Sequence, residues 1–128
     1  MRIVPLTGSL GAEIFEADLR DAAQFPEIRD AFAKHSVITL RNQSITPDDQ
    51  IAFAERWGEI NVNRFFKALD THPQIAIVLK EADQKGAIGE SWHTDHSYDE
   101  IPALGSILHA IETPPYGCLL YTSDAADE

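Results

Sequence analysis

A chain of 128 residues with 44% hydrophobic content has material for one compact domain, which at this size is expected to bury roughly two-thirds of its unfolded surface. The formal net charge of −11 disfavours nucleic acid and anionic membranes as partners, because both would repel the protein. The sequence shows no signal peptide, no run of the ~20 apolar residues that span a bilayer, and one cysteine, Cys118, which cannot form an internal disulfide; we therefore expect a soluble, cytoplasmic protein.

The N-terminal part predicts two strands, a helix and a third strand. The expected bounds are Arg2–Leu6, Ala12–Phe15, Pro26 to about Lys34, and Ser36–Leu40. Gly8 and Gly11 favour a turn between the first two strands, because glycine adopts backbone conformations that other residues avoid. Ile28, Ala31 and Phe32 form an apolar stripe on the helix. The third strand is apolar and β-branched almost throughout, which predicts that it is buried.

The clearest helix signal starts at Thr46, which is a good N-cap residue. Pro47 follows at the first helical position, and the next two residues are aspartates that complement the helix dipole. The apolar periodicity continues until Gly58. Phe53 and Trp57 are four residues apart and should pack together on the core side of this helix.

The signals after this helix are weaker. Asn61–Phe66 is expected to be a polar and aromatic connector, and Ile75–Leu79 a strand. Glu81–Glu90 is polar and contains glycines, which suggests a mobile loop. Ser106–Ile111 predicts a further strand, and Thr113–Gly117 a turn or extended linker because proline cannot donate to a sheet.

An imidazole and a carboxylate stand two residues apart in the segment Ser91–Tyr98. If the segment is extended, His93 and Asp95 face the same side with their Cα atoms roughly 6.5 Å apart. A His-x-Asp pair with one distant histidine makes the facial triad that holds Fe(II) and leaves three positions open for oxygen chemistry. The alternative is a His–Asp hydrogen bond on a surface strand.

An ordered series of motifs surrounds this pair. It comprises Pro5–Gly8, Gly11–Glu13, Thr46–Pro47, Phe53, Trp57–Glu59, Trp92–Asp95, Pro102–Ser106 and Pro114–Gly117. With this series, residues 1–117 closely resemble the N-terminal part of the TauD/TfdA (taurine dioxygenase-like) family of Fe(II)- and 2-oxoglutarate-dependent dioxygenases. The resemblance implies an α+β to mainly β fold, with a double-stranded β-helix (jelly-roll, clavaminate synthase-like) core and flanking helices, here truncated.

The resemblance also implies the chemistry of the site. His93 and Asp95 would be the first two Fe(II) ligands, and the enzyme would use O₂ and 2-oxoglutarate to hydroxylate a small organic substrate, releasing succinate and CO₂. The family's distal histidine ligand and its arginine for 2-oxoglutarate are expected downstream, so no 2-oxoglutarate-binding residue is assigned in this chain. His96 and His109 are weaker alternatives for the third ligand.

Substrate residues follow only from ungapped matching to the taurine enzyme. The positions that recognise taurine there hold Asn63, Phe66 and Gly89 here, so taurine itself is disfavoured. Asn63 and Phe66 are expected to line the substrate pocket. The partner would be a small molecule, and the oligomeric state, including a homo-oligomer, is left open.

The family pattern breaks at Cys118. Residues 118–127 read as a translation of TGT CTC TTA TAC ACA TCT GAC GCT GCC GAC, a transposase-adapter string from sequencing libraries, so we expect a non-native tail over residues 118–128. On this interpretation the 128 residues alone would be a non-catalytic truncated fragment. A metal-dependent hydrolase that uses the string from His93 to His96 is a further alternative, which Ser91 disfavours because that motif begins with another histidine there.

Overall fold

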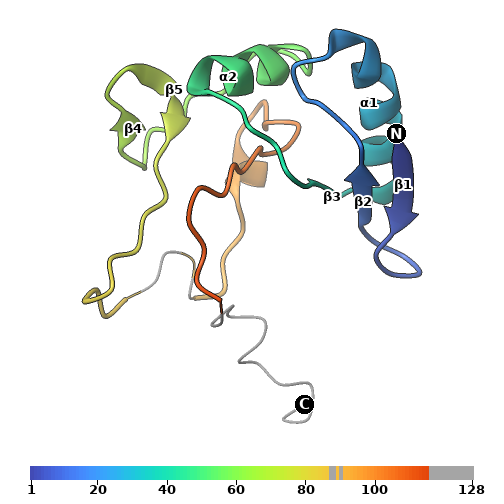
Figure 1. Ribbon diagram of the computed structural model, residues 1–128. Helices are drawn as coiled ribbons and strands as arrows, with labels where there is room; N and C mark the ends of the chain where they lie inside the picture. Colours follow the sequence, from blue (N-terminus) through green and yellow to red (C-terminus); the bar gives the residue numbers. More distant parts are fainter. Residues whose placement is uncertain (87–88, 90, 116–128) are drawn as a thin grey trace. The chain divides into compact units, whose positions relative to one another are not determined.

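The structure is a computed structural model that describes residues 1–86, 89 and 91–115 (Figure 1). Its contacts divide the chain into two compact units, Met1–Ala76 and Ile77–Glu128. The expected non-native tail lies outside the described residues, as do the last two residues of the Thr113–Gly117 turn.

A three-stranded sheet opens the first unit. Strands β1 (Arg2–Pro5) and β2 (Ala12–Phe15) pair antiparallel, and β2 pairs parallel with β3 (Ile38–Leu40) in the order β1-β2-β3. The two predicted N-terminal strands are therefore confirmed. The third is shorter than predicted and only half-buried, with Val37 48% exposed, because β3 has a neighbour on one side only among the described strands.

The turn between β1 and β2 is held by its own side chains and backbone. Thr7 Oγ1 donates to the carbonyl of Leu10 at 2.6 Å and accepts the Leu10 N–H at 2.9 Å. The N–H of Leu6 donates to the carbonyl of Gly11 at 2.9 Å. Gly11 has a φ of +85°, so the predicted need for glycine is confirmed at this position.

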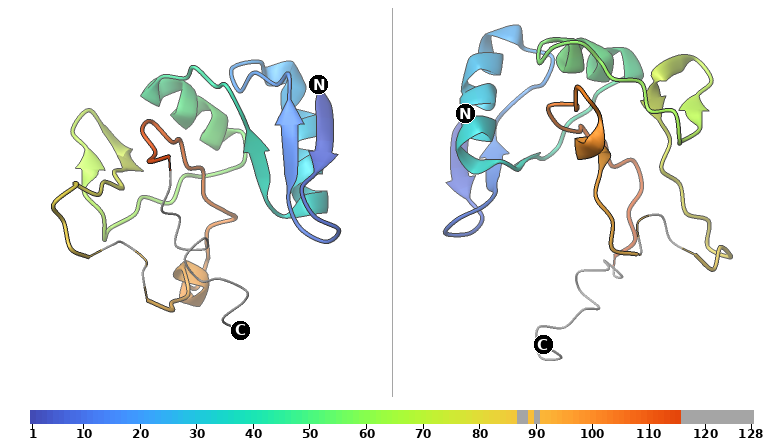
Figure 2. Two further views of the ribbon diagram at one scale, coloured as in Figure 1. Left: turned by 60° about the horizontal axis from the view of Figure 1, so that its bottom comes forward. Right: turned by 180° about the vertical axis from the view of Figure 1, so that it is seen from behind.

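Helix α1 (Phe25–His35) forms the crossover between the parallel strands β2 and β3, as Figure 2 shows. A single 3₁₀ turn, η1 (Ala22–Gln24), leads into it, and the side chain of Asp21 accepts the N–H of Ala23. Pro26 lies in the first turn, as predicted. The helix ends where Ser36 takes a left-handed conformation and donates its N–H to the carbonyl of Phe32 at 2.7 Å.

Helix α2 (Pro47–Glu55) begins at the predicted N-cap. Thr46 Oγ1 accepts the N–H of Asp49 at 3.2 Å, and the Asp49 carboxylate accepts the N–H of Thr46 at 2.8 Å, which completes a reciprocal capping box. Phe53 and Trp57 pack edge to face with their ring centres 6.0 Å apart, so that prediction is also confirmed.

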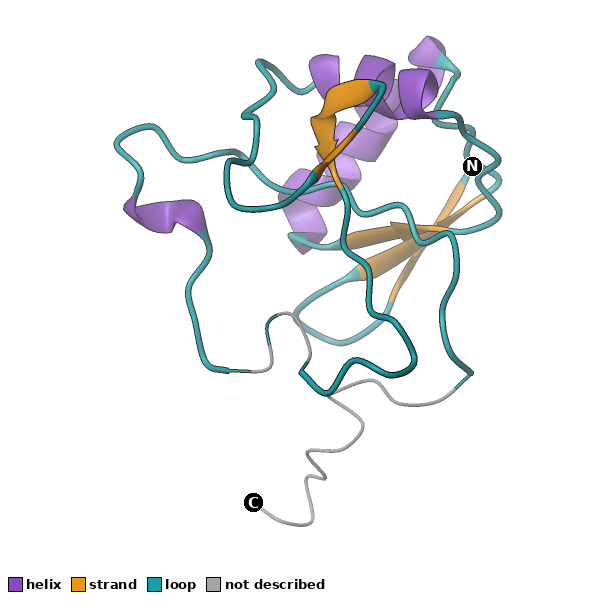
Figure 3. Ribbon diagram, turned by 90° about the vertical axis from the view of Figure 1, so that its left-hand side faces the viewer, coloured by secondary structure: helices purple, strands orange, loops and turns teal. Residues whose placement is uncertain are grey.

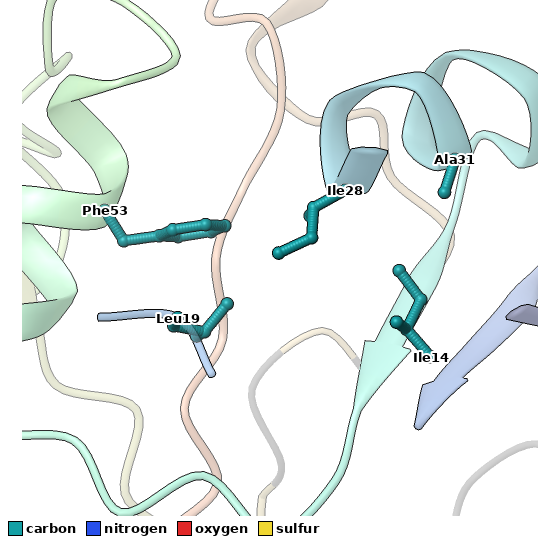
Figure 4. Close-up of a cluster of buried hydrophobic side chains, with 5 residues drawn as sticks. All are labelled: Ile14, Leu19, Ile28, Ala31 and Phe53. Carbon is teal, nitrogen blue, oxygen red and sulfur yellow. The ribbon is translucent and has the colours of Figure 1, made fainter. Parts of the chain in front are cut away.

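The core of the first unit lies between the sheet and the two helices. Its buried side chains, drawn in Figure 4, are Ile14, Leu19, Ile28, Ala31 and Phe53. Trp57 extends the cluster because its ring also contacts the rings of Phe25 at 5.1 Å and Phe32 at 5.2 Å. The apolar stripe predicted for α1 therefore faces the core, with Phe32 only half-buried.

A short hairpin ends the first unit. Strand β4 (Ala68–Leu69) pairs antiparallel with β5 (His72–Ala76). The hairpin is tied to α2 because His72 Nε2 lies 2.8 Å from Asp48 Oδ1. The strand predicted at Ile75–Leu79 was misplaced: it starts and ends earlier because β4 offers its pairing partners at Leu69 and Ala68.

The described part of the second unit is almost entirely loop. Its one regular element among residues 77–86, 89 and 91–115 is the 3₁₀ turn η2 (His96–Tyr98), as Figure 3 shows. The strand predicted at Ser106–Ile111 was wrong, and Leu108 and Ile111 are 82% and 89% exposed. Apolar content alone does not make a strand without a pairing partner. No helix in the described ranges is long and apolar enough to cross a membrane.

Candidate metal centre

His93 and Asp95 converge although they do not lie in a strand. The described residues 91–95 form no helix or strand, yet His93 Nε2 lies 3.4 Å from Asp95 Oδ1. The expectation that both side chains face the same side is therefore confirmed, while the strand on which it depended is not formed. The two side chains are 53% and 88% exposed in the structure, so a ligand can reach them.

A backbone carbonyl selects the tautomer of His93. Its Nδ1 lies 2.7 Å from the carbonyl oxygen of Ser91. A carbonyl oxygen can only accept, so Nδ1 carries the proton and donates it. In the neutral imidazole, Nε2 is then left with a lone pair, and this lone pair is on the nitrogen nearest Asp95.

The carboxylate of Asp95 is not used by the helix that it precedes. Asp95 is the N-cap residue of η2, with φ −73° and ψ −172°, but its side chain makes no capping hydrogen bond. The turn is closed by the N–H of Asp99, which donates to the carbonyl of His96 at 3.1 Å, and the backbone carbonyl of Asp95 accepts the N–H of Ser97 at 2.7 Å. An aspartate at this position usually accepts a backbone N–H, so the carboxylate here remains available to a cation.

The alternative third ligands do not join this pair. His96 Nδ1 lies 3.3 Å from Asp99 Oδ2, and its ring stacks on Tyr98 with centres 5.5 Å apart. His109 is half-buried. Within the described ranges, no group of three or more His, Cys, Asp or Glu side chains is placed to hold a metal ion.

The two expected substrate residues belong to the first unit, in the connector before β4. Asn63 Oδ1 accepts the N–H of Phe65 at 2.8 Å and of Phe66 at 3.2 Å, which makes a local turn. The side chain of Phe66 is half-buried. The structure therefore gives Asn63 a structural task, and a role for either residue in substrate binding stays a prediction.

Gly89 and the Ser91 carbonyl are contacts of His93 that the sequence does not reveal. Gly89 has a φ of +77°, and a Cβ built on it would lie 3.3 Å from His93 Cε1. Its position in a glycine-containing loop signals a turn, but not the ring that the turn packs against.

Two carboxyl groups of the first unit have a lowered pKa. The Arg20 guanidinium and backbone N–H both donate to Asp18 and lower its pKa to about 2, and the pKa of Arg20 is raised in return. The capping box lowers the pKa of Asp49, because the backbone N–H and the side chain of Thr46 donate to its carboxylate.

The donor set at His93 and Asp95 fits Fe(II) or a similar divalent ion. Imidazole nitrogen and carboxylate oxygen are ligands of non-haem iron. Neighbouring ligands of an octahedral ion bound at about 2.1 Å are about 3 Å apart. The observed separation of 3.4 Å is close to this value, and the neutral Nδ1–H tautomer leaves Nε2 free of a proton, as a metal ligand requires.

Comparisons with known proteins relate the chain to one enzyme family. The family described as taurine catabolism dioxygenase TauD, TfdA family matches residues 2–119. An alpha-ketoglutarate-dependent 2,4-dichlorophenoxyacetate dioxygenase from Cupriavidus pinatubonensis is 31% identical over 88% of this chain and 46% of the relative. An alpha-ketoglutarate-dependent sulfate ester dioxygenase from Pseudomonas putida is 32% identical over 88% of this chain and 38% of the relative.

One solved structure shares the fold of part of the chain. It is a Burkholderia xenovorans protein provisionally named an alpha-ketoglutarate-dependent taurine dioxygenase, with a TM-score of 0.51 and 35% identity over 56% of this chain and 27% of that protein. The chain spans less than half the length of the two curated relatives, at 46% and 38%. Because the family match runs through nearly the whole sequence, the chain belongs to the TauD/TfdA family.

Proposed function

We propose that the whole protein is an Fe(II)- and 2-oxoglutarate-dependent dioxygenase and that this chain supplies two of its iron ligands, His93 and Asp95. The reaction would hydroxylate a small organic substrate with O₂ and release succinate and CO₂. Membership of the TauD/TfdA family supports the reaction class, because the curated relatives are named for alpha-ketoglutarate dependence.

The observation that carries the proposal is the approach of His93 Nε2 to Asp95 Oδ1 at 3.4 Å, with His93 Nδ1 already bonded to Ser91. A surface His–Asp hydrogen bond would place a proton on the nitrogen nearest the carboxylate. The contact with the Ser91 carbonyl places the proton of a neutral His93 on the other nitrogen, which leaves the Nε2 lone pair close to the carboxylate oxygen. A cation bound by both atoms relieves their repulsion.

The residues of this chain would bind and orient the metal. A bound Fe(II) ion supplies open coordination positions at which 2-oxoglutarate and O₂ react. The Ser91 carbonyl holds the His93 ring in the tautomer that ligates through Nε2. The η2 turn, closed without the Asp95 carboxylate, leaves that carboxylate for the ion.

The substrate is a small molecule under this proposal. The named relatives act on 2,4-dichlorophenoxyacetate and on sulfate esters, which are organic anions. Asn63 and Phe66 are our candidates for contact with the substrate, on the strength of their matched positions. The matched taurine positions differ in residue type, so we do not propose taurine.

For the whole protein we further propose a double-stranded β-helix core with flanking helices. The similarity to the Burkholderia xenovorans structure supports it over 56% of this chain. The strands β1, β2 and β3 and the helices α1 and α2 would be one end of that fold.

The test is succinate formation by the whole protein, expressed from its genomic reading frame, with Fe(II), 2-oxoglutarate and a panel of small organic acids and sulfate esters. We expect succinate that depends on Fe(II) and substrate, at least about 100-fold reduced in Asp95→Asn, because a metal ligand is lost. Asp99→Asn is the matched control, since Asp99 pairs with His96. Equal activity in wild type and Asp95→Asn would refute the proposal.

A further inference from the structure

We infer that Gly89 is a positioning residue for His93. Because Gly89 has a left-handed backbone and no side chain, the imidazole ring can lie against it with Nε2 close to Asp95. The inference concerns the ring itself, and only its consequence for metal binding rests on the proposed function.

The contact between Gly89 and the ring is close. Gly89 has a φ of +77°, in the region that residues with a Cβ rarely adopt. A Cβ at this position would lie 3.3 Å from His93 Cε1 and 3.9 Å from Nε2. An alanine would therefore strain the backbone and also press on the edge of the ring that carries the metal-binding nitrogen.

The ring is held at a second point as well. His93 Nδ1 donates to the Ser91 carbonyl at 2.7 Å, on the other nitrogen of the imidazole. The carbonyl selects the tautomer, and Gly89 allows the ring to reach the carbonyl while Nε2 stays 3.4 Å from Asp95 Oδ1. If a side chain at position 89 moves the ring, the hydrogen bond to Ser91 and the approach to Asp95 are lost together.

Other glycines provide matched controls. Gly11 has a φ of +85°, and a Cβ there would lie 3.3 Å from Leu6 Cδ1, so it shares the left-handed backbone and the contact distance of Gly89. It lies in the first unit, and its neighbour is the end of a flexible side chain. A Cβ at Gly8 would meet nothing within 4 Å.

The experiment is ¹⁵N NMR of the histidine side chains in the 128-residue chain at about pH 8.5, above the ordinary range of imidazole titration. In wild type we expect His93 to be mainly the Nδ1–H tautomer. In Gly89→Ala its tautomer population should move toward that of histidine in an unfolded peptide, while Gly11→Ala and Gly8→Ala leave it unchanged. Amide shifts of residues 1–76 check that the first unit stays folded. An unchanged His93 tautomer in Gly89→Ala would overturn the inference.

A second measurement separates this inference from the proposed function. Mn²⁺ is titrated into wild type and Gly89→Ala, and broadening of the His93 ring signals reports binding. We expect affinity to fall about 10-fold or more in Gly89→Ala, as for other losses of ligand orientation. If Mn²⁺ binds both chains equally, the positioning role fails and the metal site stands. If Gly89→Ala changes the His93 tautomer as expected but Mn²⁺ does not broaden the His93 signals of wild type, the positioning role stands and the proposed function fails.

Discussion

The carboxylate of Asp95 lies 3.4 Å from His93 Nε2 and makes no capping hydrogen bond to the 3₁₀ turn that it precedes. Asp49, in the first turn of α2, shows the usual alternative: its carboxylate accepts the N–H of Thr46 and closes a capping box. The same side chain therefore stabilises a helix end in one case and remains available to a ligand in the other.

The capping box of α2 should contribute measurably to stability. Thr46→Ala removes the acceptor for the Asp49 N–H and should lower the free energy of unfolding of the first unit by about 0.5–2 kcal/mol. Thr46→Ser keeps the hydroxyl and is the control. Urea unfolding followed by Trp57 fluorescence, in a Trp92→Phe background, measures both. Equal losses for alanine and serine would show that the hydroxyl is not the stabilising group.

The core of the first unit should respond to the loss of one methylene. Ile28 is 0% exposed, so Ile28→Val should cost about 0.5–1.5 kcal/mol. Ile101 is 83% exposed, and Ile101→Val should change stability by less than about 0.5 kcal/mol. The same urea experiment compares them, and a similar effect of both substitutions would contradict the assignment of the core.

Acid should destabilise the first unit through Asp18 and Asp49. Both carboxyls have a lowered pKa in the folded protein, that of Asp18 falling to about 2. A lowered folded pKa contributes stability that is present above the ordinary value of about 3.9 and is lost as the pH falls through the folded pKa. Stability should therefore decrease from about pH 4 toward about pH 2.

Asp18→Asn tests the assignment of this pH dependence. Because Arg20 donates its hydrogen bonds to the Asp18 carboxylate, the variant should flatten the pH profile of thermal unfolding between about pH 4 and about pH 2. Asp30→Asn is a control, since Asp30 is exposed on α1 and pairs with the exposed Arg29 at 3.4 Å. A profile as steep in Asp18→Asn as in wild type would exclude Asp18 as a source.

Asn63 stabilises a local turn through its side-chain oxygen, in addition to its proposed contact with the substrate. Asn63→Ala removes the acceptor for two backbone N–H groups and should cost about 1 kcal/mol, whereas Asn63→Asp keeps an acceptor oxygen. In the whole protein, a raised KM in Asn63→Asp with unchanged stability would support substrate contact. An unchanged KM in that variant would leave Asn63 with the turn alone.

Local sequence signals predicted the helices and the approach of His93 to Asp95 well. The N-cap at Thr46, Pro26 in the first turn of α1 and the Phe53–Trp57 contact depend on neighbours within four residues, so local chemistry decides them. The approach of His93 to Asp95 was predicted for a strand, but it is reached in a segment without regular structure, with His93 Nε2 3.4 Å from Asp95 Oδ1.

Strands were harder to predict because their limits depend on distant partners. The hairpin of β4 and β5 lies upstream of the strand expected at Ile75–Leu79, since pairing with Ala68 and Leu69 sets its limits. The strand expected at Ser106–Ile111 is not formed. The tautomer of His93 could not be predicted either, because it depends on which carbonyl the ring reaches, and that is the Ser91 carbonyl.

The central claim is that His93 and Asp95 together bind a divalent metal, and paramagnetic NMR tests it most directly. Mn²⁺ is added to the 128-residue chain, and broadening is mapped in wild type, Asp95→Asn and Asp99→Asn. We expect broadening centred on the His93 and Asp95 signals in wild type and Asp99→Asn, and its loss in Asp95→Asn. Broadening that is absent in wild type, or that is the same in wild type and Asp95→Asn, would contradict the claim.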